Sequence, residues 1–236
     1  MSGPQIRGIC FFCKRELAKS GLSRHLTTCP KRLEAQAEAE RGARRRQTLY
    51  HLQVRDAWSG DYFLHLEMRG TATLHDLDEY LRAIWLECCG HLSAFEIDGV
   101  TYDSDADPFG WSDHFLMKDV KANSVFRPGL EMNYQYDFGT TSELTIKVIA
   151  QREGRPLSDH PIFLMARNLF EPPPCMVCGA PATWLCTECL YDRADDRCEL
   201  CDVHAEEHEH EEMLLALVNS PRVGMCGYSG PAEPPY

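Results

Sequence analysis

The sequence lacks the long apolar runs that a membrane protein needs. No stretch approaches the roughly 18 consecutive apolar residues that span a bilayer as a helix. The first residues, Met1–Ile9, contain Gly, Pro, Gln and Arg where the apolar core of an export signal would lie. We therefore expect a cytoplasmic protein that makes no contact with membranes.

The chain also lacks the positive net charge that is typical of general nucleic-acid binders. It has 24 Lys and Arg against 36 Asp and Glu, a formal net charge of −12. The charge is uneven, because residues 1–47 hold 11 basic and 4 acidic side chains, whereas residues 172–236 hold 3 and 12. Only the basic first segment, residues 7–46, is therefore a candidate for contact with nucleic acid.

Cysteine, by contrast, is abundant, and its spacing favours metal binding over disulfides. Most of the 12 cysteines fall in Cys-x-x-Cys pairs, and histidines accompany these pairs. Disulfide frameworks belong to exported proteins, and this sequence has no export signal. We predict three structural Zn²⁺ ions.

Composition divides the chain into five segments. A run rich in Ala, Glu and Arg follows the first cysteine cluster and favours a helix, and the run Pro172–Pro174 marks a stiff boundary. The predicted segments are a zinc finger at 1–30, a charged helical linker at 31–47, an α+β domain at 48–171, a cysteine- and histidine-rich zinc module at 172–227 and a disordered tail at 228–236.

The central segment has the signals of a sheet with one helix packed on it. In the predicted helix, Thr73 is the N-cap with Asp76 three residues later, apolar residues recur every three or four positions from Leu74 to Cys88, and Gly90 ends it. The predicted strands are Leu49–Val54, Tyr62–Met68, Ala94–Ile97, Glu131–Asp137 and Leu144–Gln151. The expected fold class is α+β: a small sheet-plus-helix domain flanked by two zinc-stabilised modules.

The first cysteine and histidine cluster has the spacing of a four-ligand zinc site. A Cys-x-x-Cys turn presents two thiolates to one ion, and a His and a Cys four positions apart lie on one helical face. The predicted ligands are Cys10, Cys13, His25 and Cys29. This segment resembles a ββα zinc finger whose last ligand is cysteine.

That resemblance places the base-reading positions of the finger at Ala18, Gly21 and Arg24. Ala and Gly cannot form the bidentate hydrogen bonds that identify bases, so we do not expect this finger to read sequence. Two roles stay open for it: non-specific contact with phosphates, and a folding staple or protein-contact module.

The second cluster contains three Cys-x-x-Cys pairs followed by three histidines. The predicted ligands are Cys175, Cys178, Cys186, Cys189, Cys198, Cys201, His204, His208 and His210. The order resembles cross-brace modules such as the B-box. The resemblance implies that the first and third pairs hold one ion, with the ligands Cys175, Cys178, Cys198 and Cys201. The second pair would then hold the other ion with two of the three histidines.

Two alternatives remain open for this cluster. The cysteine pairs could instead be used in sequential order, with the first two pairs forming one site. The choice of histidines is also open: His204 follows Cys201 by three residues, a reach of roughly 10 Å, and so reaches a distant second ion less easily than His208 or His210. His204 and His208, however, have the spacing of one helical face.

The remaining cysteines are interpreted as structural. Cys226 is expected to be a buried thiol rather than a ligand. The periodicity of the predicted helix places Cys88 in the core. Because consecutive helical residues do not share a face, Cys88, Cys89 and His91 are not expected to form a nucleophilic pair.

Four stretches of the central segment resemble a known family. They are Tyr50–Val54, Leu74–Leu77, Phe95–Tyr102 and Tyr134–Gly139. They resemble the plasmid pRiA4b ORF-3-like family, also called the insertion-sequence passenger TnpR-like family, over about residues 48–152. The resemblance implies a compact α+β domain and, through the family's name, a link to mobile genetic elements; it implies no established chemistry.

These observations favour a non-enzymatic zinc-binding interaction or accessory protein with a protein partner. No serine has the setting of a recombinase nucleophile, and closed four-ligand zinc sites are structural. One alternative is a nucleic-acid-associated accessory protein that binds DNA or RNA non-specifically through residues 7–46. Another is an enzyme whose chemistry the sequence does not identify.

Overall fold

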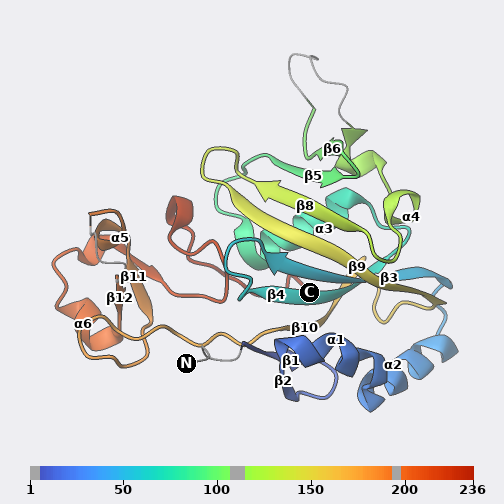
Figure 1. Cartoon of the computed structure of the whole chain (residues 1–236), viewed down its shortest axis with the longest axis horizontal. Helices are drawn as coiled ribbons and strands as arrows, with labels where there is room; N and C mark the ends of the chain where they lie inside the picture. Colours follow the sequence, from blue (N-terminus) through green and yellow to red (C-terminus); the bar gives the residue numbers. More distant parts are fainter. Residues whose placement is uncertain (1–5, 107–114, 193–197) are drawn as a thin grey trace. The chain divides into compact units, whose positions relative to one another are not determined.

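The chain folds into two compact units. The computed structural model describes residues 6–106, 115–192 and 198–236. Of these, the first unit takes residues up to Leu81, then His91–Leu169 and Tyr236, and the second takes Arg82–Gly90 and Phe170–Pro235. Sheets and short helices are mixed (Figure 1), so the fold class is α+β. Cysteine-rich clusters flank the sheet domain along the sequence. None of the described helices is long and apolar enough to cross a bilayer.

A ten-stranded sheet organises the first unit. Its strand order is β2-β1-β10-β4-β3-β9-β8-β5-β6-β7, and all neighbouring strands are antiparallel except β6 and β7. The strands are β1 (Arg7–Cys10), β2 (Glu16–Ala18), β3 (Gln47–Asp56), β4 (Phe63–Arg69), β5 (Ser93–Ile97), β6 (Val100–Asp103), β7 (Phe115–Leu116), β8 (Glu131–Tyr136), β9 (Ser142–Gly154) and β10 (Ile162–Asn168). The five strands expected in the central segment are confirmed as β3, β4, β5, β8 and β9. The sheet is larger than expected, because β1, β2 and β10 extend it beyond β4.

Strand β4 lies near the middle of this sheet and is buried on both faces. Leu64 and Leu66 point to one face, and Phe63, His65 and Glu67 point to the other, because successive side chains of a strand alternate. All five are less than 5% exposed. Two layers of structure therefore cover β4, one on each side.

Helix α3 (Leu74–Leu81) covers the first of these faces. Its buried Asp78 accepts hydrogen bonds from Tyr134 Oη of β8 at 2.7 Å and from Ser93 Oγ of β5 at 2.5 Å. Strand register places Tyr134 on the same face as Leu64, because cross-strand neighbours share a face. The short helical turns η2 (Met117–Asp119) and α4 (Ala122–Val125) follow in the same unit.

The start of α3 is the one the sequence predicts, but its end is not. Thr73 N donates to Asp76 Oδ2 at 2.7 Å and Asp76 N donates to Thr73 Oγ1 at 3.1 Å, which is the reciprocal bonding of a capping box. The helix was expected to continue to Gly90. Instead α3 ends at Leu81 and a π-helical turn, η1 (Arg82–Leu86), follows. The residues after Leu86 are therefore not helical.

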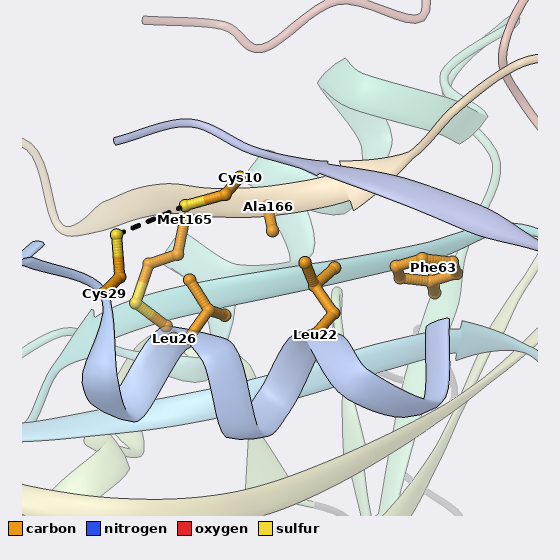
Figure 2. Packing of buried hydrophobic residues seen from close by; sticks show 7 residues of the cluster. All are labelled: Cys10, Leu22, Leu26, Cys29, Phe63, Met165 and Ala166. Carbon is orange, nitrogen blue, oxygen red and sulfur yellow. Dashed lines mark hydrogen bonds between the residues drawn. The ribbon is translucent and has the colours of Figure 1, made fainter. Parts of the chain in front are cut away.

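The N-terminal segment is built into the opposite face of the sheet. Strand β1 pairs with β10, and helices α1 (Lys19–Thr28) and α2 (Pro30–Arg41) follow. Leu22 and Leu26 of α1 are fully buried, and Figure 2 shows them pointing toward Phe63, Met165 and Ala166 of the sheet. A free finger would pack these leucines only on its own hairpin; here the sheet completes the core. The expected linker at 31–47 is largely the helix α2.

The second unit contains a small three-stranded sheet in the order β12-β11-β13. Its elements are β11 (Trp184–Cys186), α5 (Thr187–Asp192), β12 (Glu199–Leu200), α6 (Asp202–Glu206), η3 (Glu211–Met213), β13 (Leu214–Ala216) and η4 (Met225–Gly227). Cysteines make up much of its buried cluster, together with Leu185, Leu200 and Ala205. The segment from Tyr228, expected to be disordered, contains two buried side chains, Tyr228 and Ala232, each 2% exposed.

Candidate metal centres

The first centre joins the two ends of the N-terminal finger. Cys10 ends β1, Cys13 lies in the turn that follows, His25 lies on α1, and Cys29 precedes α2. Cys10 Sγ lies 3.9 Å from Cys29 Sγ, and Cys13 Sγ lies 3.3 Å from His25 Nε2. All four donor atoms lie within 4.8 Å of one another. The structure thus brings together the four residues that the sequence predicts as ligands.

The turn between the first two cysteines has the shape that a two-thiolate grip requires. Lys14 N donates to Cys10 O at 2.8 Å, and Lys14 adopts a left-handed φ of 58°. A left-handed residue after the second cysteine folds the chain back, so that Cys10 and Cys13 both face one point. The Cys175–Cys178 turn repeats this geometry, with Gly179 N bonded to Cys175 O at 2.9 Å and a Gly179 φ of 77°.

The second centre contains Cys175, Cys178, Cys201 and His204. Cys178 Sγ lies 3.8 Å from Cys201 Sγ. His204 Nδ1 lies 3.2 Å from Cys201 Sγ and 3.6 Å from Cys175 Sγ. The site therefore has three sulfur donors and one nitrogen donor, like the first centre.

The second centre differs from the expected pairing at one position. Cys198 was expected to share this ion, whereas the donors that lie within 4.8 Å of one another are those of Cys175, Cys178, Cys201 and His204. Cys201 caps α6, so His204 returns to it after one helical turn. Cys198 is instead 2% exposed in the apolar cluster of the second unit, and its carbonyl accepts a hydrogen bond from Cys186 N at 2.9 Å.

The third centre contains Cys186, Cys189, His208 and His210. Cys189 Sγ lies 3.5 Å from His208 Nε2, and His210 Nδ1 lies 3.8 Å from both sulfurs. The first Cys-x-x-Cys pair thus joins Cys201 of the third pair, and the second pair joins His208 and His210. This is the cross-brace order and not the sequential one. All three histidines of the cluster lie at a centre, whereas the B-box resemblance implied that only two of them bind metal.

The donor separations fit a tetrahedral ion. With Zn–S near 2.3 Å and Zn–N near 2.05 Å, tetrahedral geometry requires about 3.8 Å between two sulfurs and about 3.6 Å between sulfur and nitrogen. These donor separations in the three centres run from 3.2 to 3.9 Å. A disulfide would bring two sulfurs to about 2.05 Å, and none forms among the twelve cysteines, all of which lie in the described part of the chain. Sets of Cys₃His and Cys₂His₂ donors with these separations are compatible with zinc-binding modules.

The pKa values of the cysteine thiols differ between the centres. Burial raises the pKa of Cys10 to about 11, so an ion must displace a proton from this thiol when it binds. Burial also acts to raise the pKa of Cys175, but backbone N–H groups of Cys178 and Cys201 outweigh it and lower the pKa to about 6. Cys175 therefore loses its proton more easily and becomes the thiolate that binds a metal ion.

The basic N-terminal segment is largely paired with acidic side chains. Six of its eleven Lys and Arg residues form ion pairs: Arg7, Lys31, Arg32, Arg41, Arg44 and Arg46. The most buried pair joins Arg32 to Glu67, which also accepts two hydrogen bonds from Arg152, at 2.8 and 3.0 Å. Of the expected base-reading positions, Gly21 and Arg24 are exposed. The uneven charge of the sequence is thus partly balanced within the fold.

Comparison with known proteins places the chain in a family. The family model described as plasmid pRiA4b ORF-3-like protein matches residues 63–215, which extends the likeness into the second cysteine cluster. No curated protein matches the chain. A crystal structure of a protein of unknown function from Methanosarcina mazei Go1 is similar at 20% identity, with a TM-score of 0.42, over 49% of this chain and 66% of that one. Because the family model matches more than half of the sequence, the chain belongs to the plasmid pRiA4b ORF-3-like family.

Proposed function

We propose that this protein is a non-enzymatic interaction protein in which Zn²⁺ ions hold the three centres together. The observation that carries this proposal is the completeness of the donor sets, since each centre has four Cys or His donors. Catalytic zinc keeps one position open for water or substrate, whereas structural zinc is closed by four protein ligands. The three centres therefore support a structural metal and give no support to metal catalysis.

The second unit has the strongest need for such ions. Its apolar cluster has few large side chains, and the cysteines of the two centres occupy much of it. A unit of this size without a large apolar core depends on metal or disulfide links to fold. Binding of Zn²⁺ would supply this free energy directly, because the site does not exist in the unfolded chain.

Exposed apolar side chains beside the ligands support the interaction role. Val177, between two cysteines of the second centre, is 61% exposed, and Val203, between Cys201 and His204, is 64% exposed. Side chains that sit between metal ligands are held in place by the ion, so they can form a rigid contact surface at low entropic cost. A protein partner, such as one encoded with the family's mobile elements, would bind here.

Native mass spectrometry with metal analysis tests the zinc proposal. We expect each of Cys13→Ser, Cys178→Ser and Cys189→Ser to lose one Zn²⁺, because each removes a ligand from a different centre. The matched control is Ser20→Ala, an exposed position on α1 that should keep every ion. A folded wild-type protein without zinc would refute the proposal.

A second candidate function is non-specific contact with nucleic acid. It is favoured by Lys14, Arg15 and Arg24, three exposed side chains of the finger that form no ion pair with the described residues. Three such charges would give weak binding that falls with salt, since phosphate contacts release counterions.

A salt titration of binding to DNA and RNA separates this candidate from the first. If this candidate is right, the triple variant Lys14→Ala/Arg15→Ala/Arg24→Ala should bind more weakly at low salt. The slope of its log binding constant against log salt concentration should also be smaller, by about the contribution of three charges. The control is Lys118→Ala/Lys121→Ala, which removes two exposed charges from the sheet domain. An absence of binding to either nucleic acid at low salt would eliminate the candidate.

A further inference from the structure

We infer that Cys88, Cys89 and Cys226 form a fourth metal site, which takes a thiophilic divalent ion such as Zn²⁺. Cys89 Sγ lies 3.6 Å from Cys88 Sγ and 3.7 Å from Cys226 Sγ. Two sulfurs on one tetrahedral zinc are about 3.8 Å apart, whereas a disulfide would place them at about 2.05 Å. The three thiols therefore have the spacing of ligands around one ion, as in the other centres. All three belong to the second unit.

Two adjacent cysteines, Cys88 and Cys89, can bind one ion here because the helix ends before them. If the helix continued to Gly90, Cys88 and Cys89 would point about 100° apart and could not grip one ion. Because η1 ends at Leu86, both residues lie in a bend instead. Gly90, directly after Cys89, has a left-handed φ of 77°, as Gly179 has after Cys178. The chain thus turns at this site as it does at the second centre.

The third thiol is brought to the site by an anchored loop. Ser220 Oγ donates to the carbonyl of Trp85 at 2.7 Å, and both residues are at most 1% exposed. This bond fixes the start of the loop against η1, six residues before Cys226. Cys226 itself was expected to be a buried thiol, but it is exposed and has a left-handed φ of 49°. A buried structural role does not account for an exposed cysteine held in this conformation.

A buried arginine gives the site a charge that suits bound thiolates. Arg222 is 0% exposed, and its Nη2 donates to Cys88 Sγ at 3.4 Å. Three thiolates and one divalent cation have a net charge of −1, which the guanidinium offsets. Hydrogen bonds from outer groups to ligating sulfurs commonly tune metal sites in this way.

This site differs from the other three in its exposure. Cys89 and Cys226 are exposed, whereas each of the other centres has at least one buried cysteine. Solvent and competing ligands reach an exposed ion more easily, so this ion should be the first that a chelator removes. The site is independent of the proposed zinc role of the other centres, because it shares no ligand with them.

Metal content of the full-length protein tests the inference. Purified under reducing conditions with zinc, the wild type should carry four ions by native mass spectrometry. The variant Cys89→Ser/Cys226→Ser should carry three, with an unchanged circular dichroism spectrum because both positions are exposed. The control Ser59→Ala/Ser124→Ala should keep four. When a chelator is added stepwise, the wild type should first lose the fourth ion, and this early step should be absent from the double variant.

Several outcomes would overturn the inference while leaving the three-centre proposal intact. One is a wild-type protein with three ions and a double variant that also has three. Another is a wild-type mass lower by two hydrogens, with no fourth ion, because it would show a disulfide between two of these thiols. Loss of ions only from Cys13→Ser, Cys178→Ser and Cys189→Ser would have the same meaning.

Discussion

His204 Nδ1 lies 3.2 Å from Cys201 Sγ, across the first turn of α6. This short loop explains why the second centre closes with a histidine and not with Cys198. A donor three residues after Cys201 has a short reach, so it returns readily to the point where the Cys201 sulfur lies. The limited reach of His204 therefore assigns it to the second centre and leaves His208 and His210 for the third.

Replacing Cys198 and Cys201 separately tests this assignment. We expect Cys201→Ala to lose one Zn²⁺, because it removes a ligand of the second centre, and Cys198→Ala to keep all ions, because Cys198 lies outside the group. Alanine suits the comparison, since it preserves a small apolar side chain at buried Cys198. Zinc released per chain, measured with a colorimetric chelator after unfolding, gives the answer. Loss of an ion from Cys198→Ala would restore the pairing expected from the B-box resemblance.

Packing of α1 on the sheet gives a second prediction. Leu22 is fully buried against the sheet, whereas Leu33 of α2 is 49% exposed. Leu22→Ala should lower the free energy of unfolding by about 3 kcal/mol, since it removes buried methyl groups and leaves a cavity. Leu33→Ala, the control, should change it by less than about 0.5 kcal/mol. Urea unfolding in zinc-saturated buffer measures both, and equal effects would show that α1 does not pack on the sheet.

The capping box of α3 gives a third prediction. Thr73→Ala removes the hydroxyl that accepts from Asp76 N, so it should destabilise the protein by about 1 kcal/mol. Glu79→Ala, on the exposed side of the same helix, is the matched control and should have little effect. Thermal unfolding followed by circular dichroism compares the two. If Thr73→Ala matched Glu79→Ala, the box would contribute nothing to stability.

The elements with strong local signals were the ones that the sequence predicts well. Strands β3, β4 and β9 carry dense apolar or β-branched residues, and the Thr73–Asp76 pair identifies the start of α3 through bonding within four residues. The four donors of the first centre are also close in sequence, so their spacing alone indicated a site.

Features that depend on distant contacts escaped prediction. Strand β10 was missed, although it joins the N-terminal finger to the central sheet. The cluster of Cys88 and Cys89 with Cys226 unites residues more than 130 positions apart, and helical periodicity had placed Cys88 in a core. Because the apolar periodicity continues to Cys88, nothing in it shows that the helix stops at Leu86. Only a signal tying the Ser220 loop to Trp85 could have identified this site.

The buried pair His51 and His65 gives the last prediction, which concerns pH. Their rings are joined by a hydrogen bond of 2.9 Å between His51 Nε2 and His65 Nδ1, and the side chains are 5% and 0% exposed. Burial lowers the pKa of His51 to about 3, with further lowering by His65 and Arg32, and burial lowers the pKa of His65 to about 4. In the unfolded chain both should return to about 6.5. The unfolded state therefore binds more protons between these values.

It follows that stability is fully present above about pH 6.5 and is lost as the pH falls toward 4, by about 2 kcal/mol per histidine at pH 5. Acid also releases metal, so the effect must be read as a difference between variants. His51→Gln/His65→Gln should lose less stability than the wild type between pH 7 and pH 5, whereas exposed His75→Gln should follow the wild type. Urea unfolding at each pH gives the free energy of unfolding of the three proteins. If these free energies fell with pH to the same extent in all three, the buried pair would not be the source of the acid sensitivity.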